Sequence, residues 1–393
     1  MEVVRHLHRC LEELKRNDCL ELVWEPDGRE RAVIRAMCRE FAFSHQRLQP
    51  DVAVVLSRFA YVRRDGDAGV LESPEALCRI EFTCAETWHC LGILSRPTSI
   101  AMAVAAGQFG IAELADLLWR TRFVELADVA EPAERASWEF HDLLFHWRSR
   151  AGRVSGPQGG TYRHMQRATS PPAIKPRMSD DTVLLARPVD EDPPRESSLE
   201  SLMERRRSVR EQDGRAISAE QLGRLLYRVA RVQRRLPGEY QELLLRPIPA
   251  AGAIHELEFY PVVGRCDGLD RGLYHYHCEL HTLHRLATPE SDVEALLADA
   301  ALSWGKPDDP PQVLIILASR LPRLAWKYEG IAYRLTLLNA GAAIQSLYLL
   351  ATEMGLACSA IGGGDSGVFA SATALDPLVE TSVAEFAVGS KRG

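Results

Sequence analysis

Lysine is scarce in this chain of 393 residues, because only five of its 47 basic residues are lysine. Each of these is therefore a position to inspect: Lys15, Lys175, Lys306, Lys327 and Lys391. A basic excess is also missing, since the formal net charge is -7. A dedicated nucleic-acid-binding protein normally carries such an excess, so no nucleic-acid partner is expected.

Signals for secretion, disulfides and membrane insertion are missing as well. The first 18 residues, MEVVRHLHRCLEELKRND, are charged throughout and contain no apolar core, so we expect no secretory signal. The nine cysteines form no CxxC pair, which favours reduced thiols over a disulfide framework. The longest charge-free stretch, Leu335 to Thr352, contains several polar residues and reads as a buried helix. We expect a soluble, cytoplasmic protein.

The composition is that of an ordinary globular protein, with 46% hydrophobic and 26% charged residues, and the length suggests two domains. Residues 151–196 are rich in proline and glycine and have little apolar periodicity. This segment is predicted to be a linker or an ordered crossover arm. The expected organisation is an N-terminal region 1–150, the segment 151–196, and a C-terminal domain 197–393.

The N-terminal region is predicted to be α+β with short elements. Turn residues predict two hairpins, one joining Leu20–Trp24 to Arg31–Ile34 and the other joining Phe59–Arg63 to Gly69–Glu72. Helices are expected over Ile111–Arg122 and Trp138–Trp147. Short helices with two-stranded wings suggest winged-helix-like modules, and no catalytic pattern is found in this region.

The C-terminal domain is predicted to pack helices against a sheet. Expected helices cover Leu199–Arg207 and Ser218–Val229, the second with Ser218 as N-cap. A long core helix follows from about Ile331 to Met354, ended by Gly355. Expected strands are Leu257–Val263, Gly272–Tyr276 and Gln312–Ala318. The last is a continuous apolar run, which indicates a strand buried on both faces.

Three motifs in this domain could bind an anionic, flat-ringed ligand. The first is a dense basic cluster around a hydroxyl, which could bind phosphate: Arg206, Arg207, Ser208 and Arg210. The second strings small residues that let a backbone approach a ring closely: Pro249, Ala250, Ala251 and Gly252. The third is a glycine-rich turn at Gly362 and Gly363. Taken alone, the basic cluster is better interpreted as a solvated face, and the other two motifs are unspecific because loops often contain glycine and alanine.

The order of these motifs, RRSVR, PAAGA with LEFYPVV, GLYHYHCELHTL and WKYEGIAYRLTLLNAGAAIQSLYLLATEMGLACSAIGGGD, resembles the nitroreductase-fold flavoproteins. Among them it is similar to the SagB-type azoline (thiazoline and oxazoline) dehydrogenases of ribosomal peptide natural-product and antibiotic biosynthesis. The resemblance covers about Ser197 to Ser390. It implies an α+β nitroreductase-like domain, with an antiparallel or mixed sheet flanked by helices, that binds FMN as a homodimer.

The resemblance also implies roles for individual residues. The basic cluster would hold the FMN phosphate and ribityl end, helped by Lys391, and the segment Pro249–Gly252 would come from the partner subunit. Gly362 and Gly363 would face the N5 edge of the isoalloxazine. The chain departs from the family at Ala250-Ala251-Gly252 and at His255-Glu256, and its C-terminal GSKRG is short.

Lys327 and Tyr328 are the catalytic candidates, because a Lys-Tyr pair stands at the corresponding place in the azoline dehydrogenases. Oxidising an azoline removes a hydride equivalent and a proton, and the proton needs a general base. Partial desolvation beside a flavin favours the neutral amine that can accept it. Without the resemblance, Lys327 would be interpreted as a surface lysine and Tyr328 as a packing residue.

Two other patterns are set aside. The residues His275, His277, Cys278, His281 and His284 have metal-ligand chemistry but are predicted to divide between two strands of a hairpin, so no metal is expected. The segment Gly364-Asp365-Ser366-Gly367 resembles the nucleophile turn of trypsin-like proteases, but no base and acid accompany it.

The favoured function is FMN-dependent oxidation of thiazolines or oxazolines in a precursor peptide. The partners would be that peptide with its leader, a cyclodehydratase and a second copy of the chain. The N-terminal region would recognise the leader or dock the cyclodehydratase, by accepting an extended peptide at a sheet edge. The alternatives are a general NAD(P)H-dependent nitroreductase and a non-catalytic scaffold of a peptide-modifying complex.

Overall fold

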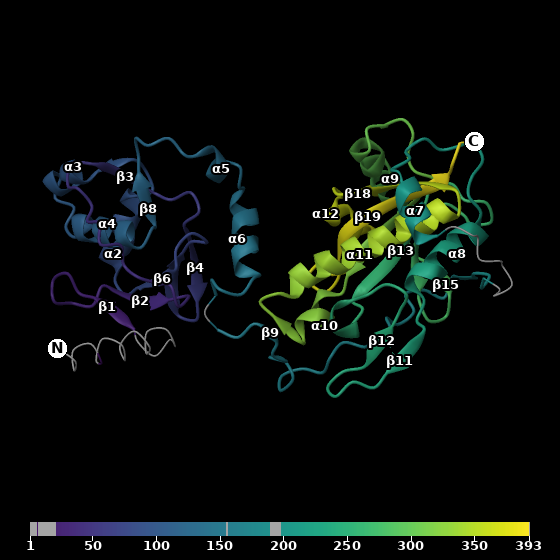
Figure 1. Ribbon diagram of the computed structural model, residues 1–393, viewed down its shortest axis with the longest axis horizontal. Helices are drawn as coiled ribbons and strands as arrows, with labels where there is room; N and C mark the ends of the chain where they lie inside the picture. Colours follow the sequence, from purple (N-terminus) through teal and green to yellow (C-terminus); the bar gives the residue numbers. More distant parts are fainter. Residues whose placement is uncertain (1–5, 7–20, 155, 189–197, 393) are drawn as a thin grey trace. The chain divides into compact units, whose positions relative to one another are not determined.

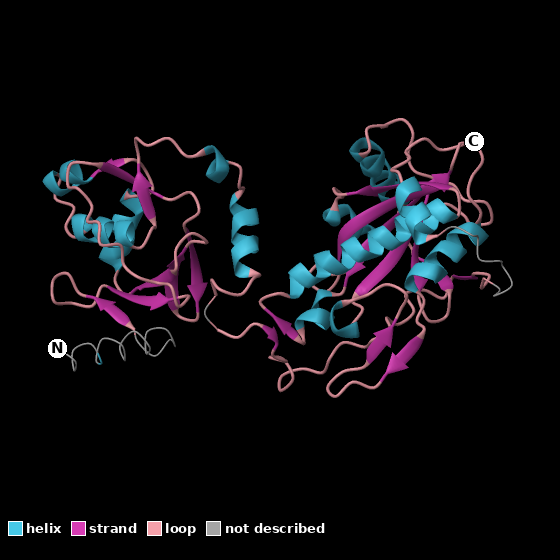
Figure 2. Cartoon of the chain, in the orientation of Figure 1, coloured by secondary structure: helices cyan, strands magenta, loops and turns pink. Residues whose placement is uncertain are grey.

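The computed structural model describes residues 6, 21–154, 156–188 and 198–392, and the N-terminal segment in which no secretory signal was expected lies almost wholly outside them. The chain divides into two compact units, Met1–Gln158 and Gly159–Gly393. Figure 2 shows that each unit contains both helices and strands. This boundary falls inside the segment 151–196 that composition marked as a linker or arm.

The first unit contains two antiparallel sheets. One has the strand order β1 (Leu22–Trp24), β2 (Ala32–Ala36), β6 (Cys78–Phe82), β5 (Ala68–Glu72) and β4 (Tyr61–Asp65). The other has the order β7 (Thr98–Ser99), β3 (Ala53–Leu56) and β8 (Val124–Leu126). Both predicted hairpins are present, because β1 pairs with β2 and β4 pairs with β5.

Helices α2 (Ala85–Ile93), α3 (Ile100–Ala105) and α4 (Ile111–Arg120) share one apolar core with these sheets. In α4 the buried side chains recur at helical spacing, which explains why this predicted helix forms: Ile111, Leu114, Ala115, Leu117 and Leu118. The short α5 (Ala133–Ala136) and α6 (Phe140–Arg148) follow. The winged-helix comparison stays a prediction.

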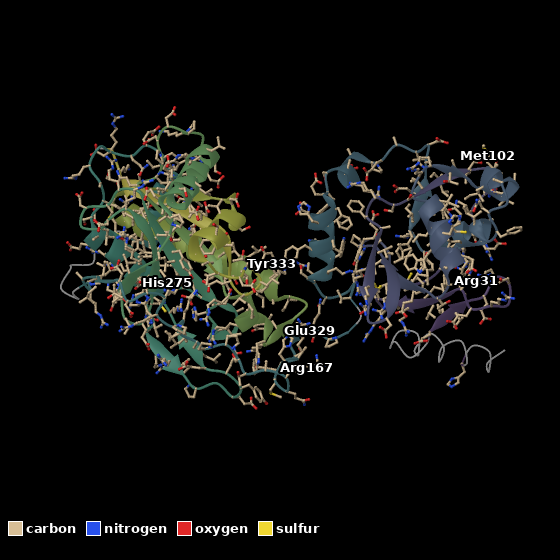
Figure 3. All side chains as sticks on the ribbon, turned by 180° about the vertical axis from the view of Figure 1, so that it is seen from behind. Arg31, Met102, Arg167, His275, Glu329 and Tyr333 are labelled. Carbon is tan, nitrogen blue, oxygen red and sulfur yellow. The ribbon has the colours of Figure 1, made fainter. Side chains whose placement is uncertain are left out.

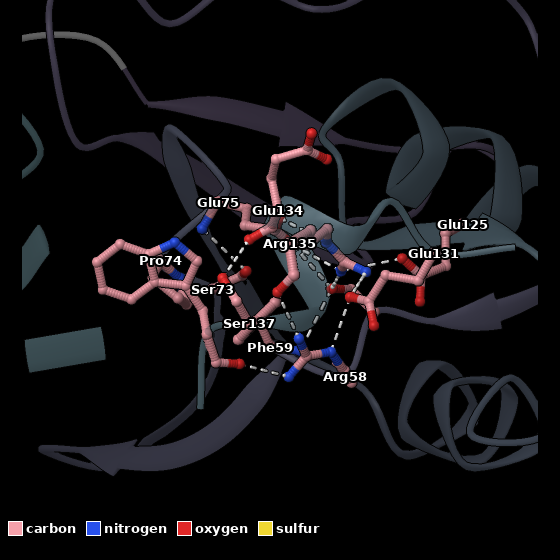
Figure 4. Close-up of polar contacts among 12 residues, drawn as sticks. Arg58, Phe59, Ser73, Pro74, Glu75, Glu125, Glu131, Glu134, Arg135 and Ser137 are labelled. Carbon is pink, nitrogen blue, oxygen red and sulfur yellow. Dashed lines mark hydrogen bonds and ion pairs between the residues drawn. The ribbon is translucent and has the colours of Figure 1, made fainter. Parts of the chain in front are cut away.

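Arg135 ties α5 to the rest of the first unit (Figure 4). Its guanidinium donates to the Glu75 carboxylate at 2.8 and 2.9 Å and to Ser57 Oγ at 2.9 Å, and it lies 3.0 Å from the Glu125 carboxylate. Burial alone would raise the pKa of Glu75, but the bonds from Arg135 hold that pKa below its usual value. Arg58 adds a bond to the Arg135 carbonyl. A four-residue helix that buries none of its side chains is thus fixed by charge-assisted bonds.

The second unit is built on one seven-stranded sheet whose neighbouring strands are all antiparallel. Its order is β10 (Thr182–Leu184), β15 (Thr282–Arg285), β14 (Gly272–His277), β13 (Leu257–Val263), β16 (Val313–Ser319), β19 (Thr381–Ser390) and β18 (Leu356–Ile361). Every residue of β13, β14 and β16 is buried, and for β16 the apolar run Gln312–Ala318 predicted this.

Helices cover both faces of this sheet (Figure 1). Helices α8 (Ala219–Ala230) and α11 (Ala332–Glu353) contribute to the core on one face, and α9 (Glu290–Ser303) and α12 (Ser366–Thr373) to the core on the other. The predicted N-cap of α8 is confirmed, because Ser218 forms a capping box with Gln221. The remaining elements are α7 (Leu199–Arg205), α10 (Leu321–Ala325), the 3₁₀ turn η1 (Ala251–Ala253), β11 (Arg234–Leu236) paired with β12 (Leu243–Leu245), and β17 (Tyr328–Glu329) paired with β9 (Gly159–Gly160).

Helix α11 differs from its prediction in one respect. It was expected to be a core helix, but only part of its surface packs in the core, and Tyr333, Leu337 and Leu338 are exposed. Among the described helices it alone is long and apolar enough to cross a membrane, by length and composition only. That is weak support for a membrane span, because core helices meet the same criterion.

Residues 159–175 form an ordered arm across α10 and the residues that follow it. Side chains of that region donate to arm carbonyls: Arg320 to Pro172 at 2.8 Å, Arg323 to Pro171 at 2.8 Å, and Trp326 to Ala168 at 2.9 Å. At the end of the arm Lys175 pairs with Glu380 and donates to Tyr260 Oη at 2.6 Å. The arm thus belongs to the second unit, held by its backbone carbonyls and, at its end, by Lys175 and the apolar Ala173 and Ile174.

Candidate functional site

Lys327 and Tyr328 follow α10 directly, where the chain turns into β17. The two-residue ladder between β17 and β9 pairs Tyr328 with Gly160, and the Tyr162 N–H donates to the Lys327 carbonyl at 3.1 Å. The Lys327 ammonium lies 5.5 Å from the Tyr162 ring centroid and 5.3 Å from that of Tyr328. Both candidates are half-buried. The arm and two aromatic faces therefore fix this lysine while leaving it accessible.

The small-residue segment lies against this pair within the same chain. Gly252 has φ +57°, and a Cβ there would lie 2.6 Å from Tyr328 Oη and 3.0 Å from Lys327 Nζ. Glycine is therefore required for both conformation and space. Pro249 and Gly252 are exposed, and Ala250 and Ala251 are half-buried. The structure brings together two motifs that lie about 75 positions apart in the sequence.

A buried polar pair behind the segment was not identified from the sequence. Asn339 on α11 donates through Nδ2 to both Glu256 carboxylate oxygens, at 2.9 and 3.1 Å, and accepts from the Ala251 N–H at 3.1 Å. Burial raises the pKa of Glu256, which is fully buried. In the sequence, Asn339 is one of the polar residues that interrupt the charge-free stretch from Leu335 to Thr352, and this interruption is its only signal.

Arg323 is a second organising residue that sequence reasoning missed. It is fully buried and donates to three carbonyls, those of Ile254, Pro171 and Glu242, at 2.7–2.9 Å. Burial, with the charges of Arg320 and Arg246, lowers its pKa to about 10. One side chain thereby joins the small-residue segment, the arm and the start of the Lys-Tyr segment.

The basic cluster lies against Tyr348, near the C-terminal end of α11. The Arg206 guanidinium is 5.1 Å from the Tyr348 ring centroid, and Ser208 Oγ is 2.8 Å from Tyr348 Oη. Arg207 Nη1 instead donates to the carbonyls of Glu204 and Arg206. Arg210 is exposed. Arg206 and Ser208 thus share one anchor, whereas Arg207 caps its own helix end.

Lys391 lies near the same cluster. Burial raises the pKa of the Cys358 thiol to about 12, and the charges of Arg206 and Lys391 both oppose that rise. The Val209 N–H also donates to the Cys358 carbonyl at 2.8 Å. Arg206 and Lys391, which are far apart in the sequence, therefore both lie near Cys358 on β18.

The glycine-rich turn follows β18 and leads into α12. Gly362 and Gly363 are exposed, and a Cβ on Gly362 would meet no atom within 4 Å. The Asp365 side chain accepts from the N–H groups of Gly367 and Val368 at 2.8 and 3.0 Å. Asp365 is thus the N-cap of α12, which accounts for the segment that resembled a protease nucleophile turn.

The histidine-rich segment forms the predicted hairpin of β14 and β15. His275 is buried, and its Nε2 lies 3.1 Å from the Glu258 carboxylate (Figure 3). His281 Nδ1 lies 2.9 Å from Tyr276 Oη. Burial lowers the pKa of His284 to about 4, with His275 and His277 adding to the effect. Among the described residues no group of three or more His, Cys, Asp or Glu could hold a metal ion.

The candidate residues fall into two groups along α11. Asn339 and the Lys327–Gly252 group lie toward its first half, and Tyr348 with the basic cluster toward its end. From Asn339 to Tyr348 the helix rises about 14 Å. In one chain, therefore, the structure joins Gly252 to the Lys-Tyr pair but does not join either to the basic cluster.

Two family descriptions match the chain. Residues 203–390 match the nitroreductase family, and residues 54–155 match the family described as cyanobactin oxidase ThcOx. A Methanocaldococcus jannaschii protein named as a nitroreductase is 32% identical over 167 residues, which are 42% of this chain and 79% of that protein.

Two further relatives come from peptide-modifying systems by name. The trifolitoxin-processing protein TfxB of Rhizobium leguminosarum bv. trifolii is 28% identical over 149 residues, 37% of this chain, and the match spans only 40% of that protein. The E. coli microcin synthetase McbBCD complex with truncated pro-MccB17 bound matches at 16% identity and a TM-score of 0.38, over 63% of this chain and 87% of that one.

The nitroreductase family match and the M. jannaschii relative confirm the nitroreductase family expected from the motif order. The nitroreductase match covers the unit that carries both candidate groups, and the cyanobactin-oxidase match falls in the other unit. The chain is an oxidoreductase that belongs to the nitroreductase family, and its residues 54–155 match the cyanobactin oxidase ThcOx family.

Proposed function

We propose that this chain is an FMN-dependent dehydrogenase that oxidises thiazolines or oxazolines of a precursor peptide to thiazoles or oxazoles, in the biosynthesis of a ribosomal peptide natural product. The observation that carries the proposal is the convergence of Lys327 Nζ and Tyr328 Oη on the backbone at Gly252. Two titratable groups and a bare backbone position meet where a flat ring could approach. This arrangement suits proton removal from a planar substrate.

The residues present fit FMN. The basic cluster with Ser208 offers charge-assisted donors for one terminal phosphate, and Gly252 and Gly362 leave bare backbone for a ring. Arg206, Ser208, Arg210 and Lys391 would hold the phosphate and ribityl end, and Gly362 and Gly363 would face the ring. FMN, when bound, supplies the acceptor for the hydride equivalent that leaves the azoline.

The chain's own residues would handle the proton. Lys327 Nζ would accept it from the ring carbon, and Tyr328 Oη would orient the amine or relay the proton onward. The backbone of the arm holds Lys327 in place, and the Tyr162 ring lies 5.5 Å from its Nζ. Arg323 and Asn339 position the segment that carries Gly252 from behind.

A homodimer would complete the site. The small-residue segment beside the Lys-Tyr pair contacts α11 at Asn339, and the basic cluster contacts it at Tyr348, about 14 Å further along the helix. The resemblance places Pro249–Gly252 and the basic cluster around one FMN on different subunits. The exposed Tyr333, Leu337 and Leu338 on α11 offer an apolar surface for that contact. We infer that the Lys-Tyr pair accompanies Pro249–Gly252 from the partner subunit.

The first unit would bind the leader peptide or a cyclodehydratase partner. Strands β1 and β4 end its larger sheet, so their outer edges could pair with an extended peptide. Beside β1 lies a pocket of about 320 Å³ whose lining includes Trp24, Arg31 and Phe109. Arg31 is labelled in Figure 3. A winged-helix-like role and a cytoplasmic location belong to the same proposal.

Two measurements test the proposal. The absorbance spectrum of the purified protein should have flavin bands, and the released cofactor should be FMN. The protein should also remove two hydrogens per ring from a purified azoline peptide, as measured by mass spectrometry. A colourless protein, or one that leaves azolines unchanged when loaded with FMN, would refute it.

A general NAD(P)H-dependent nitroreductase is the second candidate, favoured by the 32% identity to the M. jannaschii protein. Fast NAD(P)H-driven reduction of nitroaromatics, without azoline oxidation, would select it.

A further inference from the structure

Glu385 is a buried carboxyl group directly behind the glycine-rich turn. It lies on β19, is 2% exposed, and its Oε2 has no hydrogen-bond partner among the described residues. Its Oε1 lies where a side chain of residue 364 would be, because a Cβ on Gly364 would come within 2.6 Å of that oxygen. Gly364 has φ +123°, so glycine is required there on both counts.

We propose that Glu385 is a positioning residue for this turn, and that its neutral carboxyl, not a carboxylate, keeps Gly362 and Gly363 in the arrangement that binds the flavin. The inference rests on the proposed FMN role of these two glycines. It adds a residue that no motif pointed to, and it makes cofactor binding depend on one buried proton.

The surroundings of Glu385 favour the neutral form. Its cross-strand neighbours are Ile316 on β16 and Ile361 on β18, which offer no charge. Asp299 on α9 is the charged group that acts on it, and α12 begins with Asp365, whose carboxylate already caps that helix. Burial and then the charge of Asp299 raise the pKa of Glu385 to about 8.

The consequence for the turn follows from ordinary electrostatics. A protonated carboxyl can pack against the Gly364 backbone at little cost. An ionised one would place charge on a carboxyl group whose Oε2 is buried without a hydrogen-bond partner among the described residues. Removing the proton should therefore move the side chain or the turn, and Gly362 and Gly363 would move with it.

The first test is FMN binding as a function of pH, with full-length protein freed of flavin and titrated with FMN by fluorescence between pH 6.5 and 9.5. The Kd of the wild type should be level at low pH and rise about tenfold per pH unit above about 8. Glu385→Gln mimics the neutral carboxyl, so its Kd should stay level. Glu353→Gln, at a carboxylate paired with Arg228 elsewhere, is the matched control and should follow the wild type.

The second test needs no cofactor. Because the folded pKa is raised above the usual value of 4.5, the stability that Glu385 contributes is full below that value and is lost as pH rises toward about 8. The free energy of unfolding of the wild type, relative to Glu385→Gln, should fall across this range and level off above it. Should Glu385→Gln fail to fold, Asp299→Asn carries both tests, because its transition should begin at lower pH.

The outcomes are distinct. Suppose that the wild type and Glu385→Gln both bind FMN but lose it equally at high pH, or that neither of them loses it. Then Glu385 does not hold the turn, and the inference is overturned. If the stability difference stays constant with pH, Glu385 is not held neutral, which overturns it too. If neither protein binds FMN at any pH, the proposed function fails, and the inference fails with it.

Discussion

Gly252 lies directly against the hydroxyl of Tyr328, with only 2.6 Å between Tyr328 Oη and the place of a Cβ on Gly252. The same place is 3.0 Å from Lys327 Nζ. A residue without a side chain thus sets the distance between a backbone turn and two titratable groups. This contact makes the candidate site testable by the addition of one methyl group.

Gly252→Ala should displace the Lys-Tyr pair. Alanine would be strained at φ +57° and would overlap Tyr328 Oη, so azoline oxidation should fall by about 100-fold. Steady-state rates on a purified azoline peptide measure the effect. Gly214→Ala is the control, because a Cβ there would meet no atom within 4 Å, and it should leave the rate unchanged. Equal rates in both variants would contradict the site.

Lys327→Ala should keep FMN and lose azole formation, because removing a general base costs about 10²–10⁴-fold in rate. Lys327→Arg should not restore activity, since its guanidinium stays protonated. Tyr328→Phe should fall between, because it keeps the ring and loses the hydroxyl. The loss of two hydrogens per ring by mass spectrometry is the measurement. A wild-type rate in Lys327→Ala with normal FMN content would show that the proton leaves by another route.

The double variant Arg206→Ala with Arg210→Ala should weaken FMN binding, since each charge-assisted bond contributes about 1.5–3 kcal/mol. Arg207→Ala should weaken it less, because the Arg207 guanidinium donates to carbonyls of its own helix end. Flavin occupancy after purification and a fluorescence Kd compare the three proteins. Full occupancy in the double variant would exclude these arginines as the phosphate site.

Arg135→Ala should loosen the first unit, because it leaves Glu75 and Ser57 without their charged donor. A loss of about 2 kcal/mol is expected, measured as faster amide hydrogen exchange in residues 54–138. Arg47→Ala is the matched control, since that exposed arginine forms a surface ion pair with Asp116 and should change exchange little. Similar exchange in both variants would argue against the Arg135 network.

Deleting residues 1–158 should abolish action on the full-length precursor peptide but leave FMN bound. The cut follows the boundary between the two compact units, so the arm from Gly159 stays in place. Flavin absorbance and peptide mass are the two readouts. Unchanged turnover of the precursor would remove the proposed role of the first unit, and loss of FMN would show that the units depend on each other for folding.

Periodicity predicted most regular elements well, because α4, α8 and β16 bury side chains at the spacing that the sequence displays. The motif order predicted the family. What it could not predict was how the chain packs upon itself. Arg323 looks like any other arginine in an arginine-rich sequence, and only the fold turns it into a buried donor to three carbonyls.

The prolines of the segment 151–196 led to a similar difficulty. Composition indicated a stretch unable to form its own core, and that is physically sound. Of the two alternatives, linker or ordered arm, residues 159–175 form the ordered arm, because Arg320, Arg323 and Trp326 bind their carbonyls. Side-chain donors far away in the sequence leave no local signal in the segment that they hold.

That mode of attachment bears on how the protein can diversify. Carbonyl oxygens are the same in every residue, so the three donors that bind the carbonyls of Ala168, Pro171 and Pro172 put little demand on the side chains at those positions. The side chains of residues 165–173, however, line an open groove of about 730 Å³ that also includes Trp326, the residue before Lys327. Selection could therefore change the wall of this groove without disturbing the backbone that fixes the catalytic candidates.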